Sequence, residues 1–249
     1  MLYLVRKIYN PYLHNCIDPL SFDRHGLTPL DVALEKKHDN IAIYLAHEYH
    51  ARFHISNSIS SIYKYRRVFC SAFKKIAMYD RKFVLNNLLS TLQWEGGILA
   101  ELVHMSAASG NVKMLKSALK YAKSENIPMD ILYHSTQCTE QMANHFQTSE
   151  KNETFTTPLH VATKNGHCSL VKLLLLNRHR VDVRDRHGMT PLMWASISFS
   201  KGENHCIYHT LLENGADINI KDFEGNSIMN FLGKAEVVQS NKYTDNKRV

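Results

Sequence analysis

The fold is decided by residues 152–225, which carry one pattern twice and begin it a third time. The first copy starts at residues 157–162 with Thr-Pro-Leu-His-Val-Ala, and the second starts 33 residues later with Thr-Pro-Leu-Met at residues 190–193. A third start, Asp-Phe-Glu-Gly-Asn-Ser, occupies residues 222–227. Repetition at a period of this length indicates a chain built from similar structural modules.

Each copy begins with residues that favour the start of a short helix. The hydroxyl of Thr157 can accept a hydrogen bond from the first free amides of a helix, and Pro158 suits the first helical position because it has no amide proton to satisfy. Ala162 is small enough to let a neighbouring helix approach closely. Gly166 can adopt the left-handed conformation that ends a helix. The pattern therefore predicts a first helix from about residue 158 to residue 165.

A second helix follows in each copy and carries an apolar stripe. Leu170, Val171, Leu174 and Leu175 recur at positions that share one helix face. Two short helices cannot bury such a stripe by themselves, so the units are expected to stack on one another.

The boxed motif and its period resemble the ankyrin-repeat family. The resemblance implies an all-α fold, an ankyrin-repeat solenoid of stacked helix-turn-helix units with short β-turn tips. Further boxes or weaker units begin at Thr28, near Ser71, near Glu101 and near Ser227.

Spacing between these starts predicts the domain organisation. Residues 1–121 are expected to form N-terminal repeats that begin mid-repeat, with residues 1–16 as a second helix and an altered linker over residues 49–61. Residues 122–153 are interpreted as a long inserted loop with a helical turn near Met129–Tyr133. Residues 154–236 form the C-terminal repeats, with an insertion at residues 199–204, and residues 237–249 form a flexible tail.

Composition excludes several classes of function. The formal charge is +7 and the sequence pI is about 9.1, so a weak preference for acidic partners is expected. No apolar run is long enough to span a membrane, and no secretory signal is evident. Five cysteines without paired spacing favour reduced, buried or incidental thiols in an intracellular protein, cytoplasmic or alternatively nuclear.

Catalytic and cofactor motifs are not found in the sequence. It contains no phosphate-binding loop, no dinucleotide fingerprint and no nucleophile elbow, so we expect a protein that is not an enzyme and needs no cofactor. His205, Cys206 and His209 could place two imidazoles on one helix face, but no second ligand pair accompanies them. We interpret His160 and His167 as structural residues of the repeat.

The ankyrin resemblance also implies a binding surface. In members of that family the turn tips and the exposed side of the first helix line a concave face, and proteins usually bind to this face. The corresponding residues are Arg24, His25, Leu27, Lys164, Asn165, Arg186, His187, Met189, Trp194, Phe223 and Glu224. Trp194 is the strongest candidate because partly exposed tryptophans often anchor interfaces. The alternative is that Trp194 packs against a neighbouring helix and the tips are only solvated.

Three functional hypotheses follow. The first is a monomeric, non-enzymatic scaffold that binds a protein partner through its concave face, with nucleic acid not expected as a partner. The second is the ankyrin portion of a larger effector, such as a channel, a ubiquitin-ligase subunit or a kinase. The third is attachment to an anionic surface through a basic amphipathic helix at residues 61–82, whose apolar positions could equally serve only to stack the repeats.

Overall fold

The computed structural model describes residues 22–55, 59–94, 96–133, 156–200 and 205–232. These residues form helices joined by turns, and none of them belongs to a strand. Contacts divide the chain into unit 1, which ends at Trp94, and unit 2, which begins at residue 95. The expected second helix at residues 1–16 and the expected tail at residues 237–249 lie outside the described residues.

The described part of unit 1 contains two helix pairs. They are α2 (Pro29–Glu35) with α3 (Asp39–Ile55), and α4 (Ile59–Met78) with α5 (Lys82–Thr91). The first helices α2 and α4 pack together, and so do the second helices α3 and α5. The unit expected near Ser71 corresponds to the second pair, but its first helix already begins at Ile59. Its stripe is buried as expected, through Val84, Leu85, Leu88 and Leu89.

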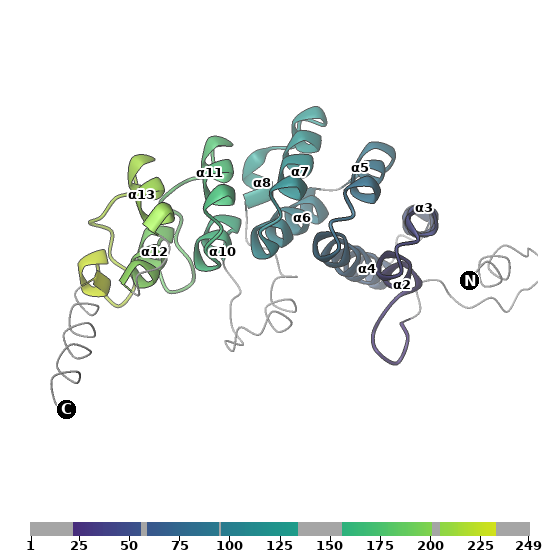
Figure 1. Cartoon of the computed structure of the whole chain (residues 1–249), viewed down its shortest axis with the longest axis horizontal. Coiled ribbons are helices and arrows are strands. Elements are labelled where there is room, and N and C mark those ends of the chain that lie inside the picture. The colour runs from purple at the N-terminus through teal and green to yellow at the C-terminus, as the bar shows by residue number, and fades with distance from the viewer. Residues whose placement is uncertain (1–21, 56–58, 95, 134–155, 201–204, 233–249) are drawn as a thin grey trace, which may run out of the picture. The chain divides into compact units, whose positions relative to one another are not determined.

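The described residues of unit 2 form three further pairs and two extra short helical segments. The pairs are α6 (Gly96–Ser109) with α7 (Val112–Ser124), α10 (Pro158–Lys164) with α11 (Cys168–Leu176), and α12 (Pro191–Ser200) with α13 (His205–Glu213). Figure 1 shows α6, α10 and α12 in one row and α7, α11 and α13 in the other, as the contacts between them require. A further helical turn occupies residues 228–232. The predicted all-α solenoid is confirmed.

The helix starts follow the predicted chemistry. Thr28 caps α2, its hydroxyl and amide both donating to the carboxylate of Asp31 at 2.8 and 2.9 Å. Thr157 caps α10 in the same way, with the Nδ1 atom of His160 lying 3.0 Å from its hydroxyl. Gly166 ends this repeat's first helix with a φ of +77°, as expected. The fourth residue of the box, Asp31 or His160, thus closes the helix start.

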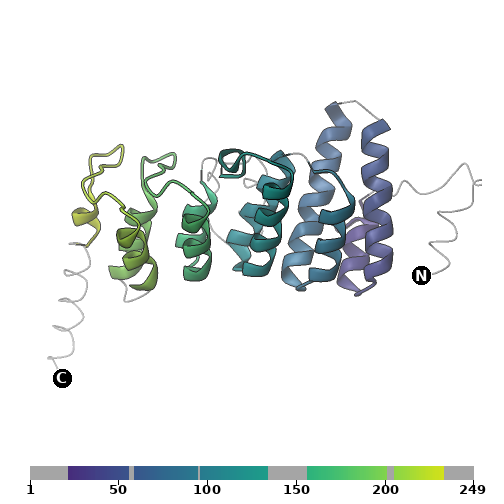
Figure 2. The same cartoon turned by 90° about the horizontal axis from the view of Figure 1, so that it is seen from above.

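Two local expectations were wrong. The linker expected over residues 49–61 is mostly helix, because α3 continues to Ile55 and α4 already begins at Ile59 (Figure 2). Tyr49, within this stretch, is buried. The basic helix expected at residues 61–82 ends at Met78, where a turn through Asp80 with a φ of +47° separates it from α5.

The insertion was partly predicted. The helical turn near Met129 forms as α8 (Met129–Tyr133), which packs on α6 where Ile131 lies against Gly96. Leu132 and Tyr133 of this turn are buried.

Trp94, the last residue of unit 1, belongs to an aromatic cluster of that unit. The ring centroid of Trp94 lies 4.9 Å from that of Phe69 and 5.4 Å from that of Phe73.

Two leucines on α11 provide a matched test of stacking. Leu174 is fully buried, whereas Leu176, two residues later, is 80% exposed. We expect Leu174→Ala to lower the free energy of unfolding by about 2 to 5 kcal/mol because it opens a cavity, and Leu176→Ala to change it by less than about 0.5 kcal/mol. Urea denaturation followed by circular dichroism would measure both, and equal losses would contradict this packing.

Candidate functional site

The turn tips of the repeats share one construction. In the tip of residues 185–189, the amide of Asp185 donates to the carbonyl of Met189 at 3.0 Å, and the Asp185 carboxylate accepts from the amides of His187 and Met189 at 2.9 and 3.0 Å. The tips that begin at Asp23 and Asp222 repeat these bonds. In each of these tips one aspartate therefore fixes the backbone of the turn. The fixed backbone in turn sets the direction of the other side chains of the tip.

The tip at Asp185 also holds an aromatic side chain. The indole Nε1 of Trp194, on α12, donates to the second carboxylate oxygen of Asp185 at 2.8 Å. The ammonium group of Lys164, on α10, lies 4.9 Å from the centroid of the Trp194 ring. Trp194 is only partly exposed, and Asp185 is buried. The indole is therefore fixed in position before any partner arrives.

Hydrogen bonds connect this region from repeat to repeat. The Nε2 atom of His160 lies 3.1 Å from the carbonyl of Met189 in the following tip, so Nε2 carries the ring proton and Nδ1 accepts from Thr157. The Nε2 atom of His167 lies 3.3 Å from the carbonyl of Ala108 in the preceding repeat. The structural roles expected for both histidines are confirmed.

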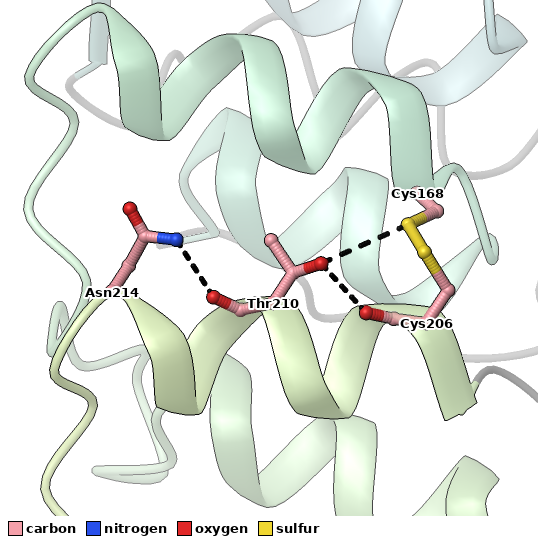
Figure 3. The surroundings of a disulfide bond; sticks show 4 residues. All are labelled: Cys168, Cys206, Thr210 and Asn214. Carbon is pink, nitrogen blue, oxygen red and sulfur yellow. Dashed lines mark hydrogen bonds between the residues drawn. A yellow bond between two sulfur atoms is a disulfide. The ribbon is translucent and has the colours of Figure 1, made fainter.

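Two cysteines that the sequence analysis interpreted as incidental thiols are bonded to each other. Cys168, at the start of α11, and Cys206, in the first turn of α13, form a disulfide with their Cα atoms 6.2 Å apart (Figure 3). The Thr210 hydroxyl donates to the Cys206 carbonyl at 2.7 Å beside this bond. Each cysteine lies near the start of the second helix of its repeat, and the two repeats are adjacent. Aligning the two repeats in the sequence would have predicted that the cysteines lie close together.

The disulfide bears on the metal hypothesis. Cys206 is used in the bond, so it cannot act as a thiolate beside His205 and His209. In the part of the chain that the structure describes, no group of three or more candidate ligands is arranged to hold a metal ion. Within the same residues, no helix is both long and apolar enough to cross a membrane.

Comparison with known proteins agrees with the repeat geometry. A family model for ankyrin repeats in three copies matches residues 100–222. The chain belongs to the ankyrin-repeat family. It is 39% identical over 69 residues to an ankyrin repeat protein of Rickettsia bellii, a match covering 28% of each chain. It is also 34% identical over 68 residues to one of Acanthamoeba polyphaga mimivirus, covering 27% of this chain and 12% of the relative. This chain thus spans well under two thirds of these relatives' own lengths.

Most of the ankyrin tip residues selected from the sequence are at the surface. Arg24, His25, Asn165, His187, Phe223 and Glu224 are exposed, and Leu27, Lys164, Arg186 and Trp194 are partly exposed. Met189 differs, because it is only 8% exposed and its backbone is used by Asp185 and His160. Met189 can therefore offer little surface to a partner. Phe223 covers the backbone of Gly188, where an added Cβ would lie 2.8 Å from its ring.

The structure brings together only part of this set. Lys164, Asp185, Arg186, His187 and Trp194 come from neighbouring repeats of unit 2. Arg24, His25 and Leu27 form the equivalent tip of unit 1. Sequence reasoning did not identify Asp185, although its place at the start of a tip would have suggested it.

The basic helix α4 is used for stacking in unit 1. Its apolar residues Phe69, Phe73 and Ile76 are almost completely buried. Lys75 pairs with Glu35 at 3.2 Å, and Arg81, just after the helix, pairs with Asp39 at 3.5 Å. Burial, together with the charge of Lys75, lowers the pKa of Lys74 below its usual range. The apolar face of α4 is thus not available to a membrane.

His179, after α11, provides a pH-sensitive element in the core. Burial lowers its pKa to about 4, and its Nε2 atom is buried without a hydrogen-bond partner among the described residues. Its ring stacks 4.5 Å from that of Tyr133, and its Nδ1 lies 2.9 Å from the carbonyl of Arg180. His160, also buried, has a lowered pKa for the same reason.

We therefore expect the stability of unit 2 to fall in acid. Below the ordinary histidine pKa of about 6.5 the unfolded chain binds a proton that folded His179 does not, so the loss grows to roughly 3 kcal/mol by about pH 4. Urea denaturation at a series of pH values would measure this slope. His179→Phe should reduce the slope between pH 6.5 and 4 and leave the part due to His160, whereas His209→Gln, at an exposed position, serves as the control and should retain the wild-type slope. Parallel curves for all three proteins would contradict the burial of a neutral His179.

The disulfide should stabilise the contact between α11 and α13. For a sequence separation of 38 residues, the loop-entropy model gives a contribution of about 3 to 4 kcal/mol. The test uses a Cys16→Ser/Cys138→Ser protein, so that these two cysteines cannot exchange with the disulfide. Reduction with dithiothreitol should lower the unfolding midpoint of this protein. Adding Cys206→Ser should lower the midpoint by the same amount and make it insensitive to dithiothreitol. A midpoint that does not respond to reduction would show that the bond contributes nothing.

Proposed function

We propose that the chain is a non-enzymatic scaffold that binds a protein partner through the concave face formed by its tips and first helices. The observation that carries the proposal is the fixed, partly exposed Trp194, held by Asp185 at 2.8 Å and by Lys164 at 4.9 Å. A side chain that is already ordered loses little conformational entropy when a partner covers it. Ankyrin repeats are generally protein-interaction modules, and this supports the proposal.

The surroundings of Trp194 fit a central anchor with a polar rim. Arg186 and His187 lie on the same tip, where the Nε of Arg186 donates to the Nε2 of His187 at 2.9 Å. Phe223 on the following tip is 69% exposed and touches the backbone of the Arg186 tip at Gly188. Aromatic and arginine side chains of this kind commonly supply most of the energy of an interface. We propose that Trp194 and Phe223 are the apolar contacts and that Arg186 and His187 select a partner with acceptor groups.

The same proposal includes the cellular setting. We infer an intracellular, cytoplasmic monomer, in which the pair Cys168 and Cys206 would be held as two thiols by the reducing surroundings. The disulfide is the one observation that opposes this localisation. Trapping thiols with an alkylating reagent at the moment of cell lysis would decide it, since a fully oxidised pair would exclude a reducing compartment.

A second candidate function rests on the comparisons. The match to the mimivirus protein covers 27% of this chain but only 12% of that relative, so similar repeats also occur within a longer protein. We therefore propose, as the second candidate, that the repeats of this chain serve as the recognition part of a larger effector such as a channel, a ubiquitin-ligase subunit or a kinase. Determining both ends of the transcript would distinguish the two candidates, because an open reading frame extending beyond residue 1 or residue 249 would favour this one.

Partner binding gives the direct test of the first candidate. We expect Trp194→Ala and, independently, Arg186→Glu to reduce capture of the same set of proteins at least about tenfold, since removal of a central anchor usually costs about 2 kcal/mol or more. Quantitative mass spectrometry after proximity labelling in native cells would measure the loss. Phe83→Ala is the matched control because Phe83 is an exposed apolar residue of unit 1 that lies outside the proposed face. Unchanged capture by both tip variants, with unchanged circular dichroism, would reject the proposed face.

A further inference from the structure

The second helices of unit 2 carry a face that the proposed scaffold function does not use. Five exposed lysines define this lysine face, four on α7 and one on α11: Lys113, Lys116, Lys120, Lys123 and Lys172. The four on α7 are separated by three, four and three residues, so they follow one side of the helix over roughly 15 Å. Helix α11 packs beside α7 (Figure 1). Lys172 lies six residues after Gly166, as Lys116 lies six residues after Gly110, so the two lysines occupy the same position of successive repeats.

Negative charge does not offset these lysines within the two helices. Neither α7 nor α11 contains an aspartate or a glutamate. Among the described residues, no acidic side chain forms an ion pair with Lys116, Lys120 or Lys172. The cations Lys75 and Arg81 of unit 1 differ, because each is paired with a carboxylate. Lys116, Lys120 and Lys172 thus present an excess positive charge to the surroundings.

An apolar side chain emerges among these lysines. Leu176, one helical turn beyond Lys172, is 80% exposed, and it is the most exposed of the large apolar residues that the structure describes. The next residue, Asn177, accepts a hydrogen bond from the ammonium group of Lys123 at 2.7 Å. This bond places the end of α7 beside Leu176. Lysine and leucine side chains therefore project from one common surface.

We propose that the lysine face and Leu176 form a docking surface for a bilayer that contains anionic phospholipids. Lysines near such a surface are attracted by its negative potential, and their flexible chains let the ammonium groups reach the headgroups. Leu176 then enters the boundary between headgroups and acyl chains, where its exposed apolar area is removed from water. The protein partner would remain bound at the tips, on other residues.

The composition of the face favours a bilayer over the other polyanions. Lysines attract the phosphates of a nucleic acid as well as those of a bilayer, so their charge does not distinguish the two. The distinction rests on Leu176, whose exposed apolar side chain has no counterpart on a phosphodiester backbone but can be buried in a bilayer. An acidic protein segment would need a complementary pocket or a rigid aromatic or arginine anchor for affinity, and the face supplies neither.

Vesicle sedimentation with the full chain tests this surface. We expect binding to vesicles of phosphatidylcholine and phosphatidylserine in a 70:30 ratio at about 0.1 M salt, no binding to pure phosphatidylcholine, and a steady loss of binding as the salt concentration rises. Since each lysine contributes about fivefold, Lys116→Gln/Lys172→Gln should lower the partition coefficient about 25-fold. Leu176→Asn should lower it roughly tenfold.

The control protein has the same net charge as Lys116→Gln/Lys172→Gln. Lys82→Gln/Lys221→Gln removes two exposed lysines outside the face and should lower vesicle binding by less than about twofold. All four proteins should have the same circular dichroism because these side chains are exposed. Three results would overturn the proposal: no vesicle binding at low salt, equal vesicle binding by the lysine-face variant and the wild type, or binding of the face to poly-glutamate or duplex DNA without binding to vesicles.

Discussion

Every pair of helices in this protein depends on its neighbours for burial of an apolar stripe. On α11, Leu170, Val171 and Leu174 are completely buried, yet the pair formed by α10 and α11 is too small to cover them. Helices α7 and α13 supply the missing contacts on the two sides of α11. The repeat is therefore not an independent folding unit, and the free energy of each one resides largely in its interfaces.

Polar groups cross the same interfaces and fix the register of the stack. Asp31 closes its own helix start and accepts from the Ser71 hydroxyl of the next repeat at 2.7 Å. His160 closes the start of α10 and reaches forward to Met189 in the same manner. An aspartate and a histidine thus perform one task at one position of the repeat. These bonds are buried or partly buried, so a repeat that shifted along its neighbour would leave polar groups unsatisfied.

Stacking creates surfaces with different chemistry as a direct consequence. The side that carries the tips presents turns stiffened by aspartates, together with Trp194, whereas the second helices present lysines and Leu176. The core between them contains His179, whose pKa is lowered by burial, and a disulfide nearer the surface links two repeats. In the two proposals above, a protein partner and a bilayer would therefore be bound by different residues.

The sequence by itself determined the repeat and most of the helix starts, because capping, proline position and apolar spacing act within a few residues of one another. It also located the tips, where the side chains of Arg186 and Phe223 are at the surface as expected. Tertiary structure alone decided that Asp185 fixes Trp194, that Met189 is buried, that Cys168 meets Cys206 and that Trp94 closes unit 1. Each of these depends on the distance between residues brought together by packing, and local sequence patterns contain no information about that distance.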